Sequence, residues 1–175
     1  IGIPIYSDAP AGHDYIVQAK GAFDETILGI LNLKKYNQKV EIRVVIHNQS
    51  VSRLKQLCEF IVKNLLFVDH VALMGLEMTG FTRANLDQLW IDPYDYKDTL
   101  SEAVQLLTRY GMNVSIYNHQ LCLVNQDVLP NYKKSISDWK NEYVEECENC
   151  SRTSECGGLF SSGAQYGYSS HLNPF

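Results

Sequence analysis

Residues 40–47 read VEIRVVIH, and this short stretch decides the fold class. It is too short and too strictly alternating for a helix, and it is rich in the β-branched residues that strands favour. Similar apolar runs occupy residues 3–6, 68–76 and 113–118. The sequence therefore predicts four strands.

Segments with the apolar spacing of helices separate these strands. Residues 14–36 carry apolar side chains at three- and four-residue intervals, with two glycines among them. A second stripe includes Cys58, which we expect to pack as a small hydrophobe. A third begins where Asp92 and Pro93 supply an N-cap and a first helical position. The alternation implies parallel strands joined by right-handed crossovers, so we expect an α/β layer or part of a (β/α) barrel.

The alternation of strands and helices ends after residue 118. We expect an α/β unit over residues 1–118 and a separate, metal-organised extension over residues 119–175, where short apolar pieces, polar turns and most of the cysteines lie. Within the extension, residues 135–143 (SISDWKNEY) favour a capped helix packed on the α/β unit. The alternative is a wall that receives a substrate.

Composition excludes several classes of protein. The formal net charge is −5, and the longest Lys/Arg run is a pair, so the basic footprint of a nucleic-acid or membrane-surface binder is missing. No apolar stretch has the roughly 20 residues that a membrane span needs, and no signal peptide opens the chain. We expect a cytoplasmic protein with neither a nucleic-acid nor a membrane partner.

The strand at residues 40–47 is polar on one side only. Arg43 and His47 share the face opposite the apolar residues, because successive side chains of a strand alternate. One interpretation is an edge strand with a wet face. The other is a barrel interior in which Arg43 and His47 hold an anionic or polar ligand. Ser7, His47 and Glu77 follow three predicted strands at their carboxyl ends, where ligands bind in such folds.

Three of the five cysteines lie within ten residues, as Cys147-x2-Cys150-x5-Cys156. An odd, clustered set is a poor disulfide framework and is more typical of a metal site. No second CxxC and no paired histidine follows, since His171 stands alone downstream. Cys122 is the nearest candidate for a fourth ligand, although its apolar neighbours also suit a buried thiol. Four thiolates fit zinc or an iron–sulfur cluster, and spacing does not decide between them.

The cysteine run resembles the auxiliary-cluster motif in the SPASM and twitch extensions of radical S-adenosylmethionine enzymes. At the start of the chain, Ser7, Asp8, the pair His13–Asp14 and the run GAFD are similar to the stretch after the fourth barrel strand of that superfamily. Further stretches resemble the radical S-adenosylmethionine maturases of His-Xaa-Ser peptide systems. These stretches are residues 13–33, 40–47, 70–81, 89–96, 134–143 and the cysteine run.

This resemblance implies a partial (β/α) barrel, the C-terminal half of a radical S-adenosylmethionine barrel, followed by the extension. The family's CxxxCxxC loop is absent from this sequence, so we expect it upstream and expect this segment alone to be inactive. In the full-length enzyme, Ser7, Arg43 and His47 would line the S-adenosylmethionine pocket. A single auxiliary [4Fe-4S] cluster would be bound by Cys122, Cys147, Cys150 and Cys156.

The function implied is the modification of a ribosomally made peptide through a 5′-deoxyadenosyl radical. The substrate peptide would carry His-Xaa-Ser repeats, and companion maturation proteins would take part. The alternative is a zinc-stabilised α/β binding or interaction module that performs no catalysis.

Overall fold

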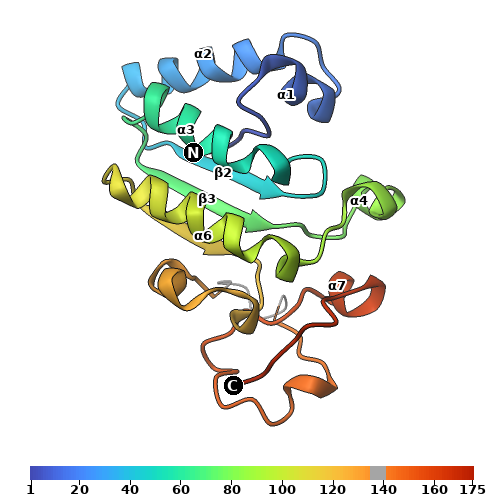
Figure 1. Ribbon diagram of the computed structural model, residues 1–175. Helices are drawn as coiled ribbons and strands as arrows, with labels where there is room; N and C mark the ends of the chain where they lie inside the picture. The colour runs from blue at the N-terminus through green and yellow to red at the C-terminus, as the bar shows by residue number, and fades with distance from the viewer. Residues whose placement is uncertain (135–140) are drawn as a thin grey trace.

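The sheet of the computed structural model, which describes residues 1–134 and 141–175, contains four parallel strands (Figure 1). They lie side by side in chain order and are β1 (Gly2–Pro4), β2 (Glu41–Ile46), β3 (His70–Gly75) and β4 (Val114–Tyr117). Every pairing is parallel, and in the register Glu41 lies opposite His70. The predicted α/β class and the four parallel strands are confirmed.

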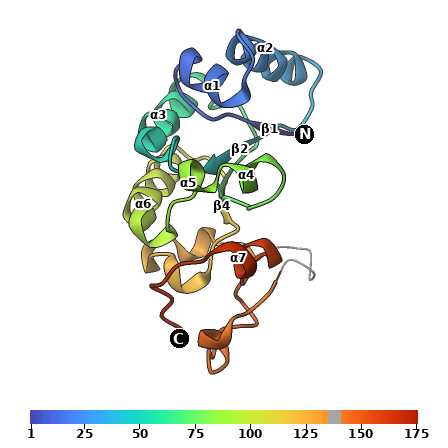
Figure 2. The same cartoon turned by 90° about the vertical axis from the view of Figure 1, so that its right-hand side faces the viewer.

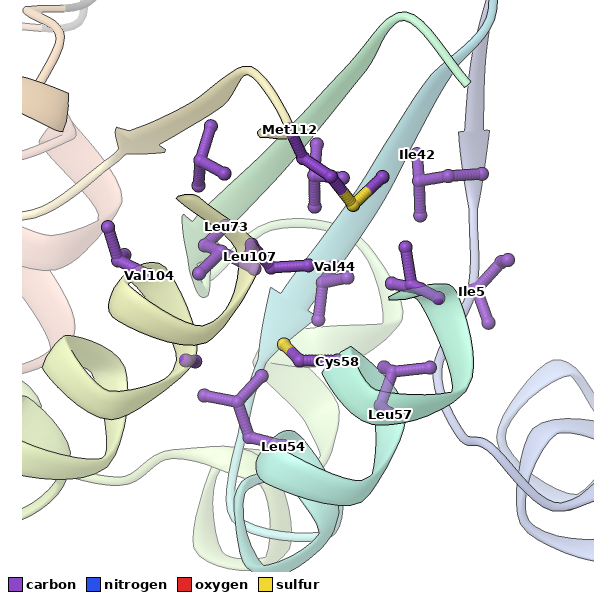
Figure 3. Packing of buried hydrophobic residues seen from close by; sticks show 14 of the residues in the cluster. Ile5, Ile42, Val44, Leu54, Leu57, Cys58, Leu73, Val104, Leu107 and Met112 are labelled. Atoms are coloured by element: carbon purple, nitrogen blue, oxygen red, sulfur yellow. The ribbon is translucent and has the colours of Figure 1, made fainter. Parts of the chain in front are cut away.

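Helices connect the strands and pack against one face of the sheet (Figures 1 and 2). The longer ones are α1 (Pro10–Val17), α2 (Ala22–Lys35), α3 (Leu54–Asn64) and α6 (Pro93–Arg109). Ile42 and Val44 of β2 point into the core between the sheet and helices α3 and α6 (Figure 3) and are at most 1% exposed, whereas Arg43, between them in the sequence, is exposed. Because β2 is flanked by β1 and β3, the edge-strand interpretation is wrong. Its polar side is open because the helices cover only the other face.

The predicted helical stretch over residues 14–36 is divided in two. Gln18 adopts φ 60° and Gly21 φ 83°, left-handed conformations that a continuous helix does not allow. The carboxylate of Asp14 accepts the amide of Gly21 at 2.6 Å and that of Phe23 at 2.9 Å. Asp14 thus closes the turn after α1 and caps the start of α2, which apolar spacing did not indicate.

The third predicted helix begins as expected. Asp92 is the N-cap of α6, since its side chain accepts the amide of Tyr94 at 2.9 Å, and Pro93 occupies the first turn. The loop between β3 and α6 contains two single helical turns. These are α4 (Phe81–Ala84) and α5 (Leu86–Leu89).

Cys58 lies in the middle of the core, as predicted (Figure 3). Its side chain is 0% exposed between the sheet and α6. Burial raises the pKa of its thiol to about 12, so Cys58 remains a protonated and unreactive thiol.

The C-terminal extension continues directly from the sheet. Tyr132 forms a bridge with Ile116 of β4, and the amide of Lys133 donates to the Ile116 carbonyl at 2.9 Å. Near the end of the chain, the ring of His171 stacks on Tyr94 of α6 with centroids 4.1 Å apart. The extension therefore packs on the α/β unit at two places far apart in sequence.

The extension's own elements are short. They comprise η2 (Leu121–Leu123), η3 (Gln126–Asn131), η5 (Glu145–Cys147) and α7 (Ser161–Tyr166). Most of the helix predicted at residues 135–143 lies outside the described residues, and within the remainder Glu142 pairs with Leu159 in an antiparallel bridge. None of the helices in the described residues has the length and apolarity of a membrane span.

Candidate metal centre and the polar face of the sheet

The four predicted cysteine ligands line one cavity in the extension. Cys122 reaches it from η2, directly after the sheet, while Cys147, Cys150 and Cys156 reach it from the cysteine run. Cys58 is not part of this group and lies in the core. Cys122 therefore lines the same cavity as three cysteines that follow it by more than 20 residues. Their spacing in the sequence does not imply this proximity.

Local turns position the three clustered cysteines. The amide of Cys150 donates to the carbonyl of Cys147 at 3.1 Å, so the CxxC forms one tight turn. The amide of Cys156 donates to the carbonyl of Arg152 at 3.1 Å, which forms a second turn. Gly158 then adopts φ +61°, and a Cβ there would lie 2.4 Å from the carbonyl oxygen of Glu142. Only glycine therefore fits where the chain returns beneath the cysteines.

The sulfur of Cys156 already accepts two backbone amides. The N–H groups of Leu121 and Gly158 each lie 3.3 Å from this sulfur. Amides directed at a sulfur stabilise its thiolate and tune the metal that it binds. Neither donor was predicted from the sequence, because both depend on how the chain folds around Cys156.

Tyr132 holds the backbone next to these amides. Its hydroxyl accepts the Gly157 amide at 2.6 Å and donates to the carbonyl of His119 at 2.8 Å. Burial, followed by the nearby Cys156, raises the pKa of the Tyr132 phenol, so it remains protonated. Sequence reasoning missed this residue, because a lone tyrosine in an irregular segment carries no pattern.

Burial in the cavity disfavours the free thiolates of Cys122 and Cys147. Burial raises the pKa of Cys122 and of Cys147, and the neighbouring cysteines contribute in the same direction. A metal centre would therefore have to displace protons from these thiols, which is the usual coupling in thiolate sites.

The four sulfurs are not gathered around a single point. Among the residues described, no three Cys, His, Asp or Glu side chains converge as ligands of one metal ion. A tetrahedral zinc with Zn–S bonds of about 2.3 Å would need its sulfurs roughly 3.8 Å apart. Four cysteines that line one cavity supply the donor set of either zinc or an iron–sulfur cluster.

Ser7 and His47 lie at the carboxyl ends of β1 and β2. Ser7 is buried, and its hydroxyl accepts the amide of Ala9 at 3.1 Å. His47 is 3% exposed, its ring lies 6.2 Å from that of Tyr6, and burial lowers its pKa. Nδ1 of His47 has no hydrogen-bond partner in the described part of the chain. Glu77 follows β3 at the same edge.

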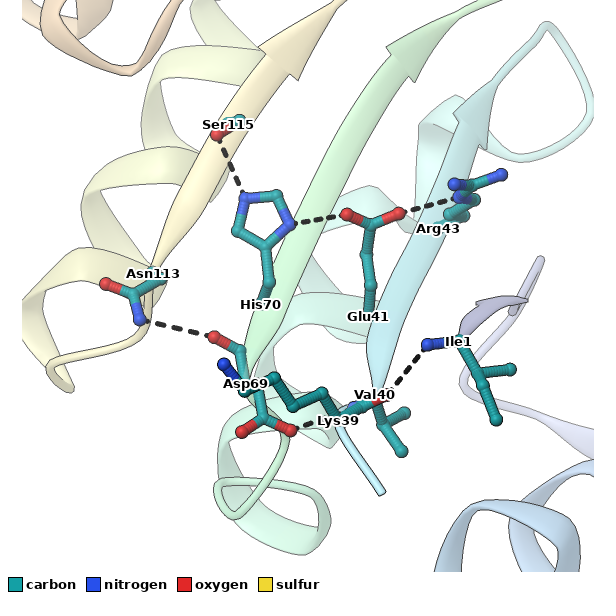
Figure 4. A network of polar contacts seen from close by, with 9 residues as sticks. All are labelled: Ile1, Lys39, Val40, Glu41, Arg43, Asp69, His70, Asn113 and Ser115. Carbon is teal, nitrogen blue, oxygen red and sulfur yellow. Dashed lines mark hydrogen bonds and ion pairs between the residues drawn. The ribbon is translucent and has the colours of Figure 1, made fainter. Parts of the chain in front are cut away.

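Arg43 belongs to a different group, on the open face of the sheet (Figure 4). Its Nε donates to one oxygen of Glu41 at 2.7 Å, and Nδ1 of His70 lies 2.8 Å from the other. The Ser115 hydroxyl lies 2.9 Å from Nε2 of His70. Arg43 precedes His47 by four residues, so their backbones are roughly 13 Å apart along the strand.

Ser115, His70 and Glu41 are hydrogen-bonded in the order of a hydrolase catalytic triad. They do not lie at the edge of the sheet where a parallel sheet places its active site. These residues lie toward the amino ends of their strands, away from the edge at which parallel sheets bind ligands. Arg43 also neutralises the carboxylate that would orient the histidine. We assign the group to cross-strand linkage of β2, β3 and β4.

Comparisons of the chain with protein-family models and with curated proteins find no match. The strongest feature is the cavity that unites Cys122 with the cysteine run.

Proposed function

We propose that the four-cysteine cavity binds one [4Fe-4S] cluster. The observation that carries the proposal is the position of Cys122, which lines the same cavity as Cys147, Cys150 and Cys156 although it precedes them by more than 20 residues. The amides directed at Cys156 support it further, because iron–sulfur ligands commonly accept such hydrogen bonds.

We further propose that the chain is the C-terminal half of a radical S-adenosylmethionine barrel with its auxiliary-cluster extension. The parallel sheet, with its helices on one face, is compatible with part of such a barrel. In this proposal the open face is the lumen, and Ser7 and His47 belong to the S-adenosylmethionine pocket. Arg43 was expected there too, but its pairing with Glu41 places it outside the pocket.

The reaction proposed for the complete enzyme is radical modification of a ribosomally made peptide, aided by companion maturation proteins. Reductive cleavage of S-adenosylmethionine needs a CxxxCxxC-bound cluster, and this sequence contains no such motif. Cys122 and the three cysteines of the cysteine run would hold the auxiliary cluster, which would supply a site for substrate binding or electron relay. The residues of this chain would orient the peptide and exclude water.

Anaerobic reconstitution with iron and sulfide tests the cluster. We expect absorption near 400 nm and about four iron and four sulfide per chain, because four thiolates complete one [4Fe-4S] cluster. Cys122→Ser should lose most of the iron, whereas Cys58→Ala, a core substitution, should retain it. A colourless protein that holds one zinc would instead support the zinc-stabilised module and overturn the cluster.

An activity assay of the complete enzyme tests the reaction class separately from the cluster. With S-adenosylmethionine, a reductant and the peptide, it should release 5′-deoxyadenosine and change the peptide's mass. The chain of residues 1–175 should release none. An intact cluster without 5′-deoxyadenosine from the complete enzyme would contradict the radical mechanism but not the metal centre.

A further inference from the structure

Residues 171–175, which we call the strap, run from beside α6 to the cysteine run (Figures 1 and 2). They follow α7 without regular secondary structure. At the start of the strap, the ring of His171 stacks on Tyr94 with centroids 4.1 Å apart, and its Nδ1 lies 3.4 Å from the carboxylate of Asp92. Because Asp92 and Tyr94 belong to the N-cap and first turn of α6, this end of the strap is anchored to the α/β unit.

The other end of the strap is held by the cysteine run. The main-chain oxygen of Phe175 accepts the Ser151 amide at 2.9 Å and the Ser151 hydroxyl at 3.1 Å. The guanidinium of Arg152 lies over the Phe175 ring, 4.8 Å from its centroid. Ser151 and Arg152 directly follow Cys150, so the residues that hold Phe175 lie between two of the proposed metal ligands.

Between its two ends the strap covers the cysteine cavity. Pro174 and Phe175 line this cavity together with the four cysteines. Burial is the largest influence on the pKa of Cys122, which it raises, and a hydrogen bond from the backbone of Asn173 partly opposes it. Asn173 therefore lies against one proposed ligand, and the next two residues form part of the cavity wall.

The covered cavity is too small for the proposed cluster. Its free volume is about 20 Å³, which is room for roughly one water molecule. Part of the wall must therefore move before four iron and four sulfide can assemble there. Leu121 and Leu159 of the wall are 3% and 5% exposed, whereas Phe175 is 40% exposed. The strap is the part of the wall that can move without opening the buried interior.

We propose that the strap is a displaceable cover, whose residues 173–175 close the empty cavity and swing away about the His171 anchor when the metal centre assembles. Opening breaks only contacts near the surface, so it requires less free energy than unfolding of the core. Each opening uncovers the sulfur of Cys122. The identity of the metal centre rests on the proposed function, but the opening of the strap in the metal-free protein does not.

Thiol labelling of the metal-free chain tests the cover without any cluster. The chain is treated with N-ethylmaleimide, and mass spectrometry of its peptides gives the labelling rate at Cys122. Phe175→Ala removes the ring that Arg152 holds, so we expect Cys122 to react about tenfold faster. Phe81→Ala, at a ring that is 92% exposed on α4, should leave the rate unchanged. Cys58 should stay unlabelled in every variant that remains folded.

A second pair of variants tests the contact that holds the ring. Arg152→Gln removes the cation over Phe175 and should speed the labelling of Cys122, whereas Arg152→Lys keeps a cation there and should stay within about twofold of the wild type. This pair decides the question if Phe175→Ala unfolds and exposes Cys58. The same variants are then reconstituted anaerobically with iron and sulfide, and the absorbance near 400 nm should grow faster wherever labelling is faster.

Wild-type labelling of Cys122 in both Phe175→Ala and Arg152→Gln, with Cys58 protected, would overturn the cover. Faster labelling with an unchanged rate of cluster formation would overturn its displacement during assembly. Faster labelling in a protein that forms no cluster at all would contradict the proposed function and leave the strap as a cover of the four thiols.

Discussion

His119 shows how one residue connects the sheet to the extension. Its Nδ1–H donates to the carbonyl of Tyr117 at 2.7 Å, so Nε2 is an acceptor and receives the hydroxyl of Tyr96 at 2.9 Å. Burial lowers the pKa of His119 to about 4, which keeps the ring neutral in the folded state. The sequence indicated neither partner, because both depend on how the chain turns after β4.

The low pKa predicts a loss of stability in mild acid. An unfolded histidine binds its proton near pH 6.5, so the folded state is favoured fully above that pH and loses stability as the pH falls toward 4. The contribution of His119 should decrease by about 2 kcal/mol between pH 7 and pH 5. Urea unfolding at both pH values measures it. His119→Gln should be less stable at pH 7 but less pH-dependent.

At the scale of elements, the sequence predicted the strands well because their signal is local. In β2 the alternation of apolar and polar residues determines which side chains face the helices. A helix would instead show apolar residues at three- and four-residue intervals. The turn between α1 and α2 was missed because it depends on Asp14 binding two amides further along the chain. The link from Glu41 to His70 was missed for a related reason, since it requires the register of two strands.

Two glycines of the extension should respond oppositely to the same substitution. Gly158→Ala places a Cβ 2.4 Å from the Glu142 carbonyl oxygen at φ +61°, so we expect a loss of at least 1 to 2 kcal/mol, on the order of the strain at such positions. Gly163→Ala, within α7, meets only ordinary contacts with Leu159, and we expect a gain of about 0.5 kcal/mol. Chemical denaturation measures both. A neutral Gly158→Ala would show that the chain does not return beneath the cysteines as described.

At the scale of the whole molecule, the chain consists of one apolar core, to which Val124 and Val128 of the extension contribute, and a cysteine-containing segment that is organised differently. The core joins the sheet to α3 and α6 through large apolar side chains such as Leu57, Leu73 and Leu107 (Figure 3). Around the cysteines, hydrogen bonds and short turns dominate, and few buried apolar side chains contribute. The sequence could predict four metal-ligating cysteines, but their meeting at one cavity depends on the packing of residues 119–134 against β4.

This difference predicts where a cluster would stabilise the protein. Ligand binding stabilises the parts that must be ordered to bind it, so assembly of the cluster should slow amide hydrogen exchange in residues 121–124 and 142–159. The core strands β2 and β3 should exchange at nearly the same rate with and without iron, because their burial does not involve the cysteines. Hydrogen exchange followed by mass spectrometry compares the two states, with Cys122→Ser as the control that cannot complete the site. If protection rose equally in β2 and in the extension, the two parts would fold as one cooperative unit, and the cysteines would stabilise the sheet as much as the segment that contains them.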